Sequence, residues 1–466
     1  MTNGAIAAPT DERPTSFRAI LAVLLGAEFA SALPAGMIYT ALSKLYGIYG
    51  DPAHVTWLVT AYALSAAAST VLFSRLGDIY GRAKLLKLML LFATVGSVVS
   101  AVATDLDVII FGRALQGVST AILPLGLGIL REHTTDLRQR NFGVGLGYVL
   151  SGLIVDNLPW QFIFVVSGGA ALLTLLIALR IVRDPPLLTV PSRLDWTGAV
   201  FVVPVTALLL GLTLGWNSGW RSPVALGLLV VGLLSLAWWV RHELRQENPL
   251  VDVRLLANPT IAIVNAAIFF TAMAPMIYTQ VLLPLLQQPA WTGIGLGVSA
   301  TMAGLIKLPT NATSASAAIL VGWLSRDRSM RPAVIGATQL NLLAFVLLIF
   351  YHDSAWFIMA VSVILIAPGV TIMFACAPGL IMNAAPPDRT SEATGLTSVL
   401  RSIATAIGTQ VLALSLASSA VTNAKGQSFP DERAYVVTFG VITVACLLSL
   451  LCAMLIPRET NPRDAA

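Results

Sequence analysis

Long apolar runs, repeated from one end of the chain to the other, constrain this sequence more than any other feature. A helix that crosses a membrane needs about 20 mainly apolar residues. Thirteen runs of about that length occur, together with a shorter run at 142–155. The predicted spans are 17–39, 55–74, 85–104, 108–130, 142–155, 160–180, 196–215, 222–240, 260–286, 295–324, 332–350, 355–383, 393–418 and 434–456. We therefore predict an all-α membrane protein with fourteen transmembrane helices.

The composition agrees with a chain that has lipid as its solvent. Of 466 residues, 56% are hydrophobic and only 11% are charged, whereas soluble domains average about 25% charged residues. All three cysteines lie in apolar runs, which argues against a disulfide framework. No short apolar stretch with a cleavage site precedes the first span, so we expect no cleaved signal peptide.

The lysines and arginines predict the orientation in the membrane. If the N-terminus is cytoplasmic, 21 of the 28 basic residues fall in cytoplasmic segments, and only Lys44, Arg221, Lys425 and Arg433 fall outside. This bias is the one that the positive-inside rule describes. An even number of spans places both termini on one side. We expect a multi-pass protein of the inner (plasma) membrane with both termini in the cytoplasm.

The loop after the second span carries a recognisable pattern. It reads Ser74-Arg-Leu-Gly-Asp78-Ile-Tyr-Gly81-Arg82-Ala-Lys84. Glycine at a tight turn lets two helices approach closely, and an aspartate and an arginine at helix ends can pair across neighbouring helices. The loop resembles the signature loop of the major facilitator superfamily, in which Asp78, Gly81 and Arg82 match. The resemblance implies that these residues form a conformational gate.

Further stretches resemble the same superfamily. The stretch 57–62 resembles the opening of its second span, and 111–117 resembles its fourth-span motif. The loop 322–332 resembles a degenerate second copy of the first signature loop, and its charged gate residues would be Asp327, Arg328 and Arg331. A loop repeated on one membrane face implies two parallel six-helix halves.

Fourteen spans leave two beyond those halves, which we assign to a central inserted hairpin. Its flanks, around Asp195 and Asp252, resemble those of the fourteen-span drug:proton antiporter family. The resemblance implies a cytoplasmic tail (1–16), an N-terminal six-helix half (17–183), a linker with the hairpin (184–241), a cytoplasmic connection (242–259), a C-terminal six-helix half (260–457) and a second cytoplasmic tail (458–466).

The fifth span departs from the family pattern. The family signature for antiport is matched at Gly143, Gly147 and Gly152, but Tyr148 replaces its proline. Fourteen residues reach about 21 Å as a helix, less than the membrane core of about 30 Å. Local thinning could compensate for this, or the chain could have lost part of the mechanism, and the sequence leaves both open. The aspartate that the family has in its first span is also absent.

Two ionisable side chains inside the spans of the N-terminal half are candidates for proton coupling. Glu28 is the only acidic residue within a long apolar span. Burial favours the neutral form of a carboxyl group, so Glu28 could bind and release a proton near neutral pH. Arg113 in the fourth span stays charged and needs a partner, either Glu28 or the carbonyl groups of a neighbouring helix.

Other polar and adaptable side chains are candidates for the wall of a substrate cavity. Lys307 lies in the tenth span and is followed by Pro309 and several polar residues, so that side of the helix cannot face lipid. Lys307 could contact an anionic substrate, or its ammonium group could extend to the membrane surface. The predicted cavity residues are Gln116, Lys307, Asn311, Tyr278, Met373 and Arg401.

The function that these features favour is proton-coupled export of amphipathic small molecules or drugs. Two alternatives stay open: a carrier for one dedicated metabolite, and a non-transporting membrane scaffold or sensor with a degraded fifth helix. We expect no enzyme, because no nucleotide-binding glycine loop and no metal-ligand cluster is visible. The expected partners are the lipid bilayer, a small-molecule substrate and protons. We expect a monomer that binds no cofactor, no metal and no nucleic acid.

Overall fold

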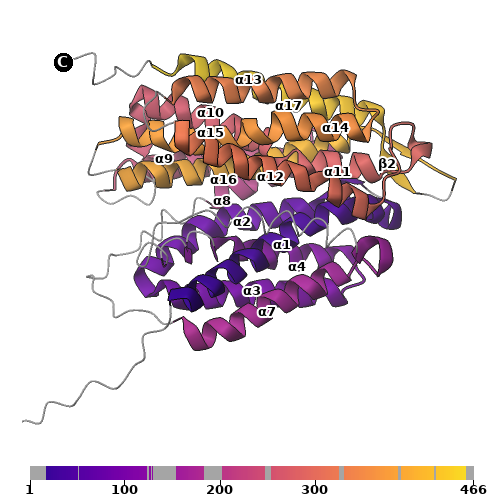
Figure 1. Cartoon of the computed structure of the whole chain (residues 1–466), viewed down its shortest axis with the longest axis horizontal. Coiled ribbons are helices and arrows are strands. Elements are labelled where there is room, and N and C mark those ends of the chain that lie inside the picture. Colours follow the sequence, from indigo (N-terminus) through magenta and orange to yellow (C-terminus); the bar gives the residue numbers. More distant parts are fainter. Residues whose placement is uncertain are drawn as a thin grey trace, which may run out of the picture.

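The helices of this chain form two groups that lie side by side (Figure 1). The computed structural model describes residues 17–50, 52–122, 125–126, 129, 154–182, 202–246, 253–324, 330–386, 390–424 and 427–457. What we call the N-terminal group contains α1 (Phe17–Tyr49), α2 (Pro52–Tyr80), α3 (Arg82–Val102), α4 (Leu106–Val118), the 3-10 turn η1 (Ser119–Ala121) and α7 (Phe162–Ile181).

The C-terminal group is built mainly from long helices, several of which are interrupted. It contains η3 (Val253–Ala257), α10 (Pro259–Met273), η4 (Pro275–Ile277), α11 (Thr279–Gln287), η5 (Ala290–Thr292), α12 (Ala300–Leu324), α13 (Arg331–Phe350), α14 (Ala355–Val361), the π-helical turn η6 (Ser362–Ile366), α15 (Ala367–Ala384), α16 (Thr390–Leu416) and α17 (Glu432–Leu455). The antiparallel strands β1 (Ala420–Thr422) and β2 (Ser428–Pro430) connect α16 to α17.

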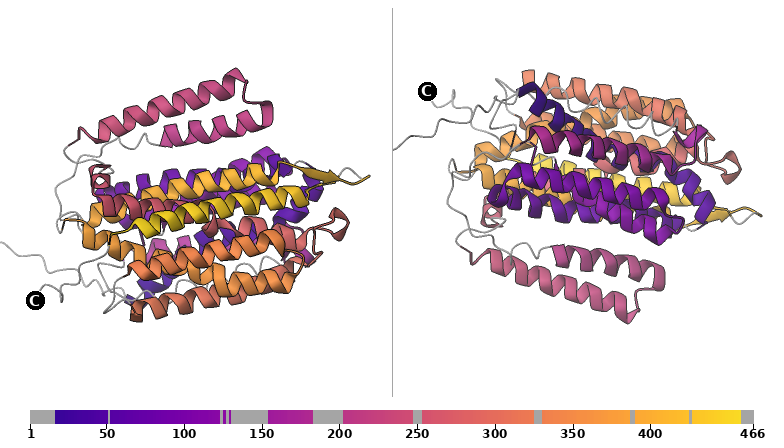
Figure 2. Two further views of the ribbon diagram at one scale, coloured as in Figure 1. Left: turned by 90° about the horizontal axis from the view of Figure 1, so that it is seen from above. Right: turned by 90° about the horizontal axis from the view of Figure 1, so that it is seen from below.

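Two further helices stand to one side of both groups (Figure 2). They are α8 (Val202–Ser218) and α9 (Pro223–Glu243), which pack against each other, and α8 also contacts α2 and α16. Only 17% of the most apolar stretch of α9 is buried in protein. Most of that apolar surface is therefore available to lipid.

Glycines bring two helices of the N-terminal group into close contact. A Cβ atom on Gly96 of α3 would lie 2.6 Å from the main-chain oxygen of Gly112 on α4. A Cβ atom on Gly112 would lie 2.8 Å from the main-chain oxygen of Gly96. Small residues allow such backbone approach between membrane helices. The contact places Arg113, the neighbour of Gly112, inside the group.

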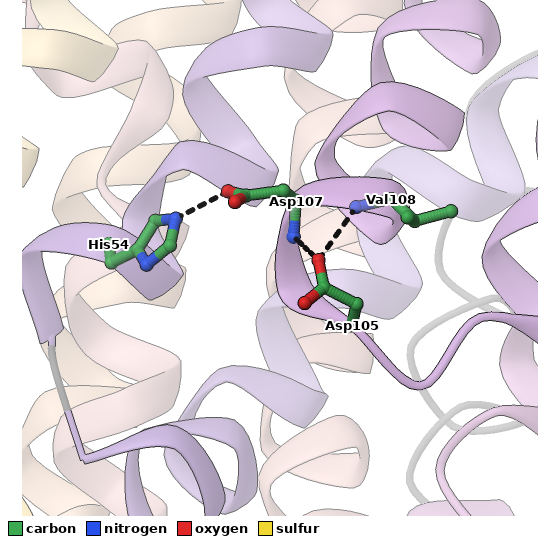
Figure 3. Close-up of polar contacts among 4 residues, drawn as sticks. All are labelled: His54, Asp105, Asp107 and Val108. Carbon is green, nitrogen blue, oxygen red and sulfur yellow. Dashed lines mark hydrogen bonds and ion pairs between the residues drawn. The ribbon is translucent and has the colours of Figure 1, made fainter.

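An aspartate cap starts α4 at one end of the N-terminal group. One carboxylate oxygen of Asp105 accepts hydrogen bonds from the main-chain N–H groups of Asp107 and Val108, at 2.9 and 3.4 Å (Figure 3). The carboxylate of Asp107 lies 2.8 Å from Nε2 of His54, near the start of α2. The cap satisfies free N–H groups of the first turn, and the contact with His54 joins two helix starts.

Eight stretches in the described part of the chain are long and apolar enough to cross a membrane. They are Ala22–Tyr49, Arg82–Val102, Phe162–Ile181, Pro223–Glu243, Arg331–Phe350, Ala355–Ala384, Gly395–Leu416 and Glu432–Leu455. Two shorter apolar helices are Val203–Leu212 and Pro259–Met273. The count of fourteen spans therefore stays a prediction.

The structure differs most from the predicted spans in two places. Apolar sequence predicts one span over 260–286, but α10 ends at Met273 and the chain resumes as η4 and α11. Ala274 has a non-helical φ of −134° and ψ of −66°, and the following proline has no N–H group to continue the helix. The predicted first span, 17–39, also ends too early, since α1 continues to Tyr49. Protein rather than lipid covers its last turns, where Leu42 and Leu45 are fully buried.

At one end of the bundle the two groups pack directly against each other. There, α1 contacts α11, and Phe429 of β2 lies in the hydrophobic core of the N-terminal group with Leu42 and Tyr46. Phe429 is 3% exposed, so this residue of the C-terminal group is enclosed by the other group. We call this end the closed end.

Candidate functional site

Arg113 is buried at the centre of the N-terminal group and is 1% exposed. Its Nε donates a hydrogen bond to the main-chain oxygen of Leu58 at 3.0 Å. One terminal nitrogen donates to the main-chain oxygen of Pro34 at 3.1 Å and to Oε1 of Gln116 at 2.7 Å. The guanidinium also lies over the ring of Tyr62, 4.4 Å from its centroid. Arg113 thus joins α1, α2 and α4.

Gln116 extends this polar cluster toward two more helices. Its Nε2 donates to Oγ of Ser97 on α3 at 2.7 Å, and Ser97 lies 3.4 Å from Oγ of Ser167 on α7. All three side chains are buried. Buried polar groups that have all found partners fix the arrangement of the helices around them. We call the set of Arg113, Gln116, Ser97 and Tyr62 the arginine cluster.

Glu28 is partly buried on α1 near the arginine cluster. It lies within electrostatic range of the Tyr62 hydroxyl. Of the two kinds of partner predicted for Arg113, the structure shows the main-chain carbonyl groups. None of the three hydrogen bonds of Arg113 goes to a carboxylate. The proton-coupling role of Glu28 and Arg113 stays a prediction.

Lys307 is a buried cation of the C-terminal group and is 8% exposed. Its ammonium group donates a hydrogen bond to the hydroxyl of Tyr278, which directly follows η4. Its Nζ also lies over the Tyr278 ring, 3.8 Å from the centroid. Both contacts come from one neutral side chain, so no carboxylate balances the charge in these contacts.

A small cavity lies beside Lys307 and Tyr278. Its wall is formed by Tyr278, Thr279, Leu282, Leu283, Leu286, Ala303, Ile306, Lys307, Thr310, Ile358 and Ser362. The space suits water-sized groups and is too small for a drug-sized molecule. Thr310 is 3% exposed, and its hydroxyl makes no hydrogen bond of normal geometry, although the Tyr278 hydroxyl lies nearby. We call this site the lysine cavity.

The other predicted cavity residues fall in different surroundings. Asn311 is partly buried beside the lysine cavity residue Thr310, and its amide nitrogen has no hydrogen-bond partner. Met373 is fully buried in the hydrophobic core of the C-terminal group, which is a packing position. Arg401 is partly buried on α16, and its guanidinium lies 5.6 Å from the centroid of the Phe374 ring.

The structure describes part of the predicted gate loops. Gly81 precedes α3 with φ 103°, a conformation that only glycine adopts easily. Asp78 lies on the last turns of α2, and Arg82 begins α3 with a partly buried side chain. Arg331 donates to the main-chain oxygens of Ile456 and Met454 at 2.6 and 3.0 Å, so it binds the end of α17.

Several predicted residues lie outside the described part of the chain. They are Asp327 and Arg328 of the second loop, and Gly143, Gly147 and Gly152 of the fifth span. The same holds for the side chain of Asp78. Their roles stay predictions.

Sequence reasoning missed one contact between the two groups, at the closed end. The carboxylate of Asp156 accepts hydrogen bonds from the main-chain N–H groups of Ala300 and Thr301, at 3.0 and 2.7 Å. Asp156 thereby caps the start of α12 from the other group. Partial desolvation raises its pKa, but the hydrogen bonds from residues 299–301 outweigh this effect and hold the pKa below its ordinary value of 3.8. The partners are 144 residues apart, so no local pattern could predict them.

The sequence matches a known protein family along most of its length. Residues 24–195 and 196–409 match the family model of the Major Facilitator Superfamily. The chain belongs to the major facilitator superfamily. It is therefore a multi-pass membrane transporter and not an enzyme.

Curated members of the superfamily include several drug-resistance proteins. The chain is 26% identical to the lincomycin resistance protein LmrB of Listeria monocytogenes, over 94% of this chain and 96% of that protein. It is 25% identical to multidrug resistance protein 3 of Bacillus subtilis, over 84% of this chain and 78% of that protein. It is 28% identical to the acurin A biosynthesis cluster MFS-type transporter of Aspergillus aculeatus, but spans only 56% of that protein's length.

Solved transporter structures share the fold at low sequence identity. The crystal structure of the peptide transporter POT in complex with sulfate aligns with a TM-score of 0.67 over 96% of each chain, at 15% identity. The partially occluded inward-open xylose transporter XylE of E. coli aligns with a TM-score of 0.60 at 11% identity. These likenesses support the fold and carry no information on the substrate.

Proposed function

We propose that this protein is a proton-coupled exporter of amphipathic small molecules in the plasma membrane. Relatives named for multidrug and lincomycin resistance support the drug-type substrate. The observation that carries the coupling is the partly buried Glu28 near the arginine cluster, in which Arg113 is fully buried. A carboxyl group beside a fixed cation can change its protonation as the conformation changes its surroundings.

The proposed architecture assigns the two helix groups to two six-helix halves, with α8 and α9 as the inserted hairpin. The two separate matches of the family model, which meet at residue 195, support this division. We further propose cytoplasmic termini, from the distribution of basic residues, and a monomeric transporter. In this orientation the closed end faces away from the cytoplasm.

The experiment that tests the function is efflux of a fluorescent dye from proteoliposomes under an imposed pH gradient. We expect the wild type to concentrate dye against its gradient and Glu28→Gln to lose this uphill transport. Downhill exchange should survive in the variant, because glutamine keeps the shape and hydrogen bonds of glutamate without its titration. Glu432→Gln, which changes an exposed glutamate at the start of α17, is the control and should behave as the wild type.

Two outcomes would contradict the proposal in different ways. Uphill transport by Glu28→Gln would place the coupling site elsewhere. No transport by the wild type, with or without a gradient, would favour the scaffold or sensor alternative. The alternative transport function is that of a carrier for one dedicated metabolite, which would be anionic. The charge of Lys307, whose contacts with Tyr278 include no carboxylate, favours this alternative.

A further inference from the structure

Around the lysine cavity, two helical segments interrupt their regular backbone and a third, continuous helix contains a proline. The break between α10 and α11 ends at Tyr278, and the π-helical turn η6 begins at Ser362. The third helix, α12, contains Pro309 between Lys307 and Thr310. Both interruptions and Pro309 therefore lie within two residues of a polar residue that lines the same cavity.

Such a coincidence has a physical meaning in a membrane protein. Interrupted backbone within the membrane is tolerated where it is buried in protein or lines a cavity. In transporters, discontinuous helices mark the sites where substrates and ions bind, and π-helical turns are often retained at functional sites. The irregular backbone around the lysine cavity is therefore of the kind that surrounds binding sites in transporters.

The polar groups of the cavity wall determine which ligand it suits. Lys307 donates one hydrogen bond to the phenol oxygen of Tyr278, and an ammonium group has three protons to donate. The phenol can still donate its own proton. Thr310 adds a buried hydroxyl without a partner of normal geometry, and Ser362 adds another hydroxyl. The wall contains no acidic side chain among its described residues. It therefore offers several donors and one positive charge.

A buried cation without a counter-ion is unfavourable unless something compensates its charge. The Tyr278 ring and hydroxyl compensate in part. We propose that the lysine cavity binds one small monoanionic group, with Lys307 as its counter-ion and Tyr278, Thr310 and Ser362 as hydrogen-bond donors. The occupant is either the carboxylate of a transported substrate or a free small anion such as chloride. This deepens the proposed function by assigning a charge preference to one part of the substrate path.

Binding is tested first, without transport, by titrating sodium acetate and sodium chloride calorimetrically into the purified protein at constant ionic strength. We expect wild-type binding to be lost in Lys307→Met and weakened about tenfold in Thr310→Val. Two variants serve as controls: Lys84→Met removes an exposed lysine, and Thr313→Val removes a hydroxyl that is already bonded to the Pro309 carbonyl. Both controls should bind as the wild type. Equal binding by the wild type and Lys307→Met would overturn the proposal.

Transport then distinguishes the two sources of the anion. An amphipathic dye with one carboxylate is compared with its methyl ester in proteoliposomes. If the substrate supplies the anion, Lys307→Met slows transport of the acid at least about tenfold and leaves the ester unchanged. If a free anion occupies the cavity, removal of chloride slows both dyes in the wild type. Equal transport of both dyes by every protein, with or without chloride, would overturn the link to transport. Lys307-dependent acetate binding without any dye transport would refute the proposed function and leave the anion site intact.

Discussion

The arginine cluster and the lysine cavity each bury one cation in the middle of a helix group, but they treat it differently. Arg113 has three hydrogen bonds to oxygens on three helices and an aromatic ring above it. Among the described residues, Lys307 has polar contacts with Tyr278 alone, beside the lysine cavity and the hydroxyl of Thr310, which makes no hydrogen bond of normal geometry. The fold supplies oxygen partners from three helices for the first cation and one hydroxyl for the second.

This difference separates two uses of a buried charge. A guanidinium has donors in a fixed planar fork, so carbonyl groups from several helices can satisfy it at once. An ammonium group on a flexible side chain can adapt to a ligand that binds reversibly. We interpret Arg113 as a structural connection among α1, α2 and α4, and Lys307 as a position held ready for a ligand.

The largest expected effect comes from removing each cation in turn. Arg113→Met leaves two carbonyl groups and Gln116 without their donor, and hydrogen bonds to charged groups contribute about 1.5–3 kcal/mol each. We expect this variant to have a clearly lower melting temperature in detergent. Lys307→Met removes an under-compensated charge and should melt at or above the wild-type temperature. A lower melting temperature for Lys307→Met than for Arg113→Met would reverse the comparison.

A smaller effect is expected when Lys307 is given a permanent partner, as Arg113 has in the arginine cluster. Thr310→Asp places a carboxylate beside Lys307 and supplies the counter-ion from within the chain. We expect acetate affinity to fall at least about tenfold, while the melting temperature stays at or above that of the wild type. Thr313→Asp is the matched control and should retain acetate binding. If Thr310→Asp bound acetate as well as the wild type does, Lys307 would not be the group that attracts the anion.

The smallest expected effects distinguish the two aromatic partners. The Tyr62 hydroxyl donates to the main-chain oxygen of Ser31 at 3.3 Å, so only its ring contacts Arg113. The Tyr278 hydroxyl accepts from Lys307 directly. Tyr62→Phe should therefore change stability by about 1 kcal/mol or less and leave acetate binding unaltered. Tyr278→Phe should weaken acetate binding by a few-fold in the same titration. Unaltered acetate binding by Tyr278→Phe would show that Tyr278 contributes through its ring alone.

Sequence reasoning predicts the helices better than their interruptions. Hydropathy places the span 332–350 almost where α13 (Arg331–Phe350) lies, because a membrane helix needs a continuous apolar length. The break at Ala274 has a visible cause in Pro275, but a proline alone does not reveal whether a membrane helix bends or stops. The π-helical turn at Ser362 has no comparable signal in the sequence.

In the candidate site, too, the sequence predicts some residues and not the partners that the fold brings to them. Lys307 and Arg113 are conspicuous in the sequence because charges are rare in apolar spans. Their partners are not, since the carbonyl oxygens of Leu58 and Pro34 belong to the backbone, which carries no sequence signal for this contact. The sequence could have predicted Thr310 as a site residue, because it lies nearly one helical turn after Lys307. Only the packing of α11, α12 and α14 brings Ser362 to the same cavity.

The cap that Asp156 provides for α12 contributes to the free energy needed to open the closed end. When the closed end opens, the first turn of α12 loses its carboxylate cap and water takes its place. Loss of a side-chain cap is worth about 0.5–2 kcal/mol, and each 1.4 kcal/mol changes a population ratio tenfold. The contact can therefore bias the resting ensemble toward closure by roughly two- to thirty-fold. Thermal motion still breaks such a contact readily, so the cap favours one state without trapping the protein in it.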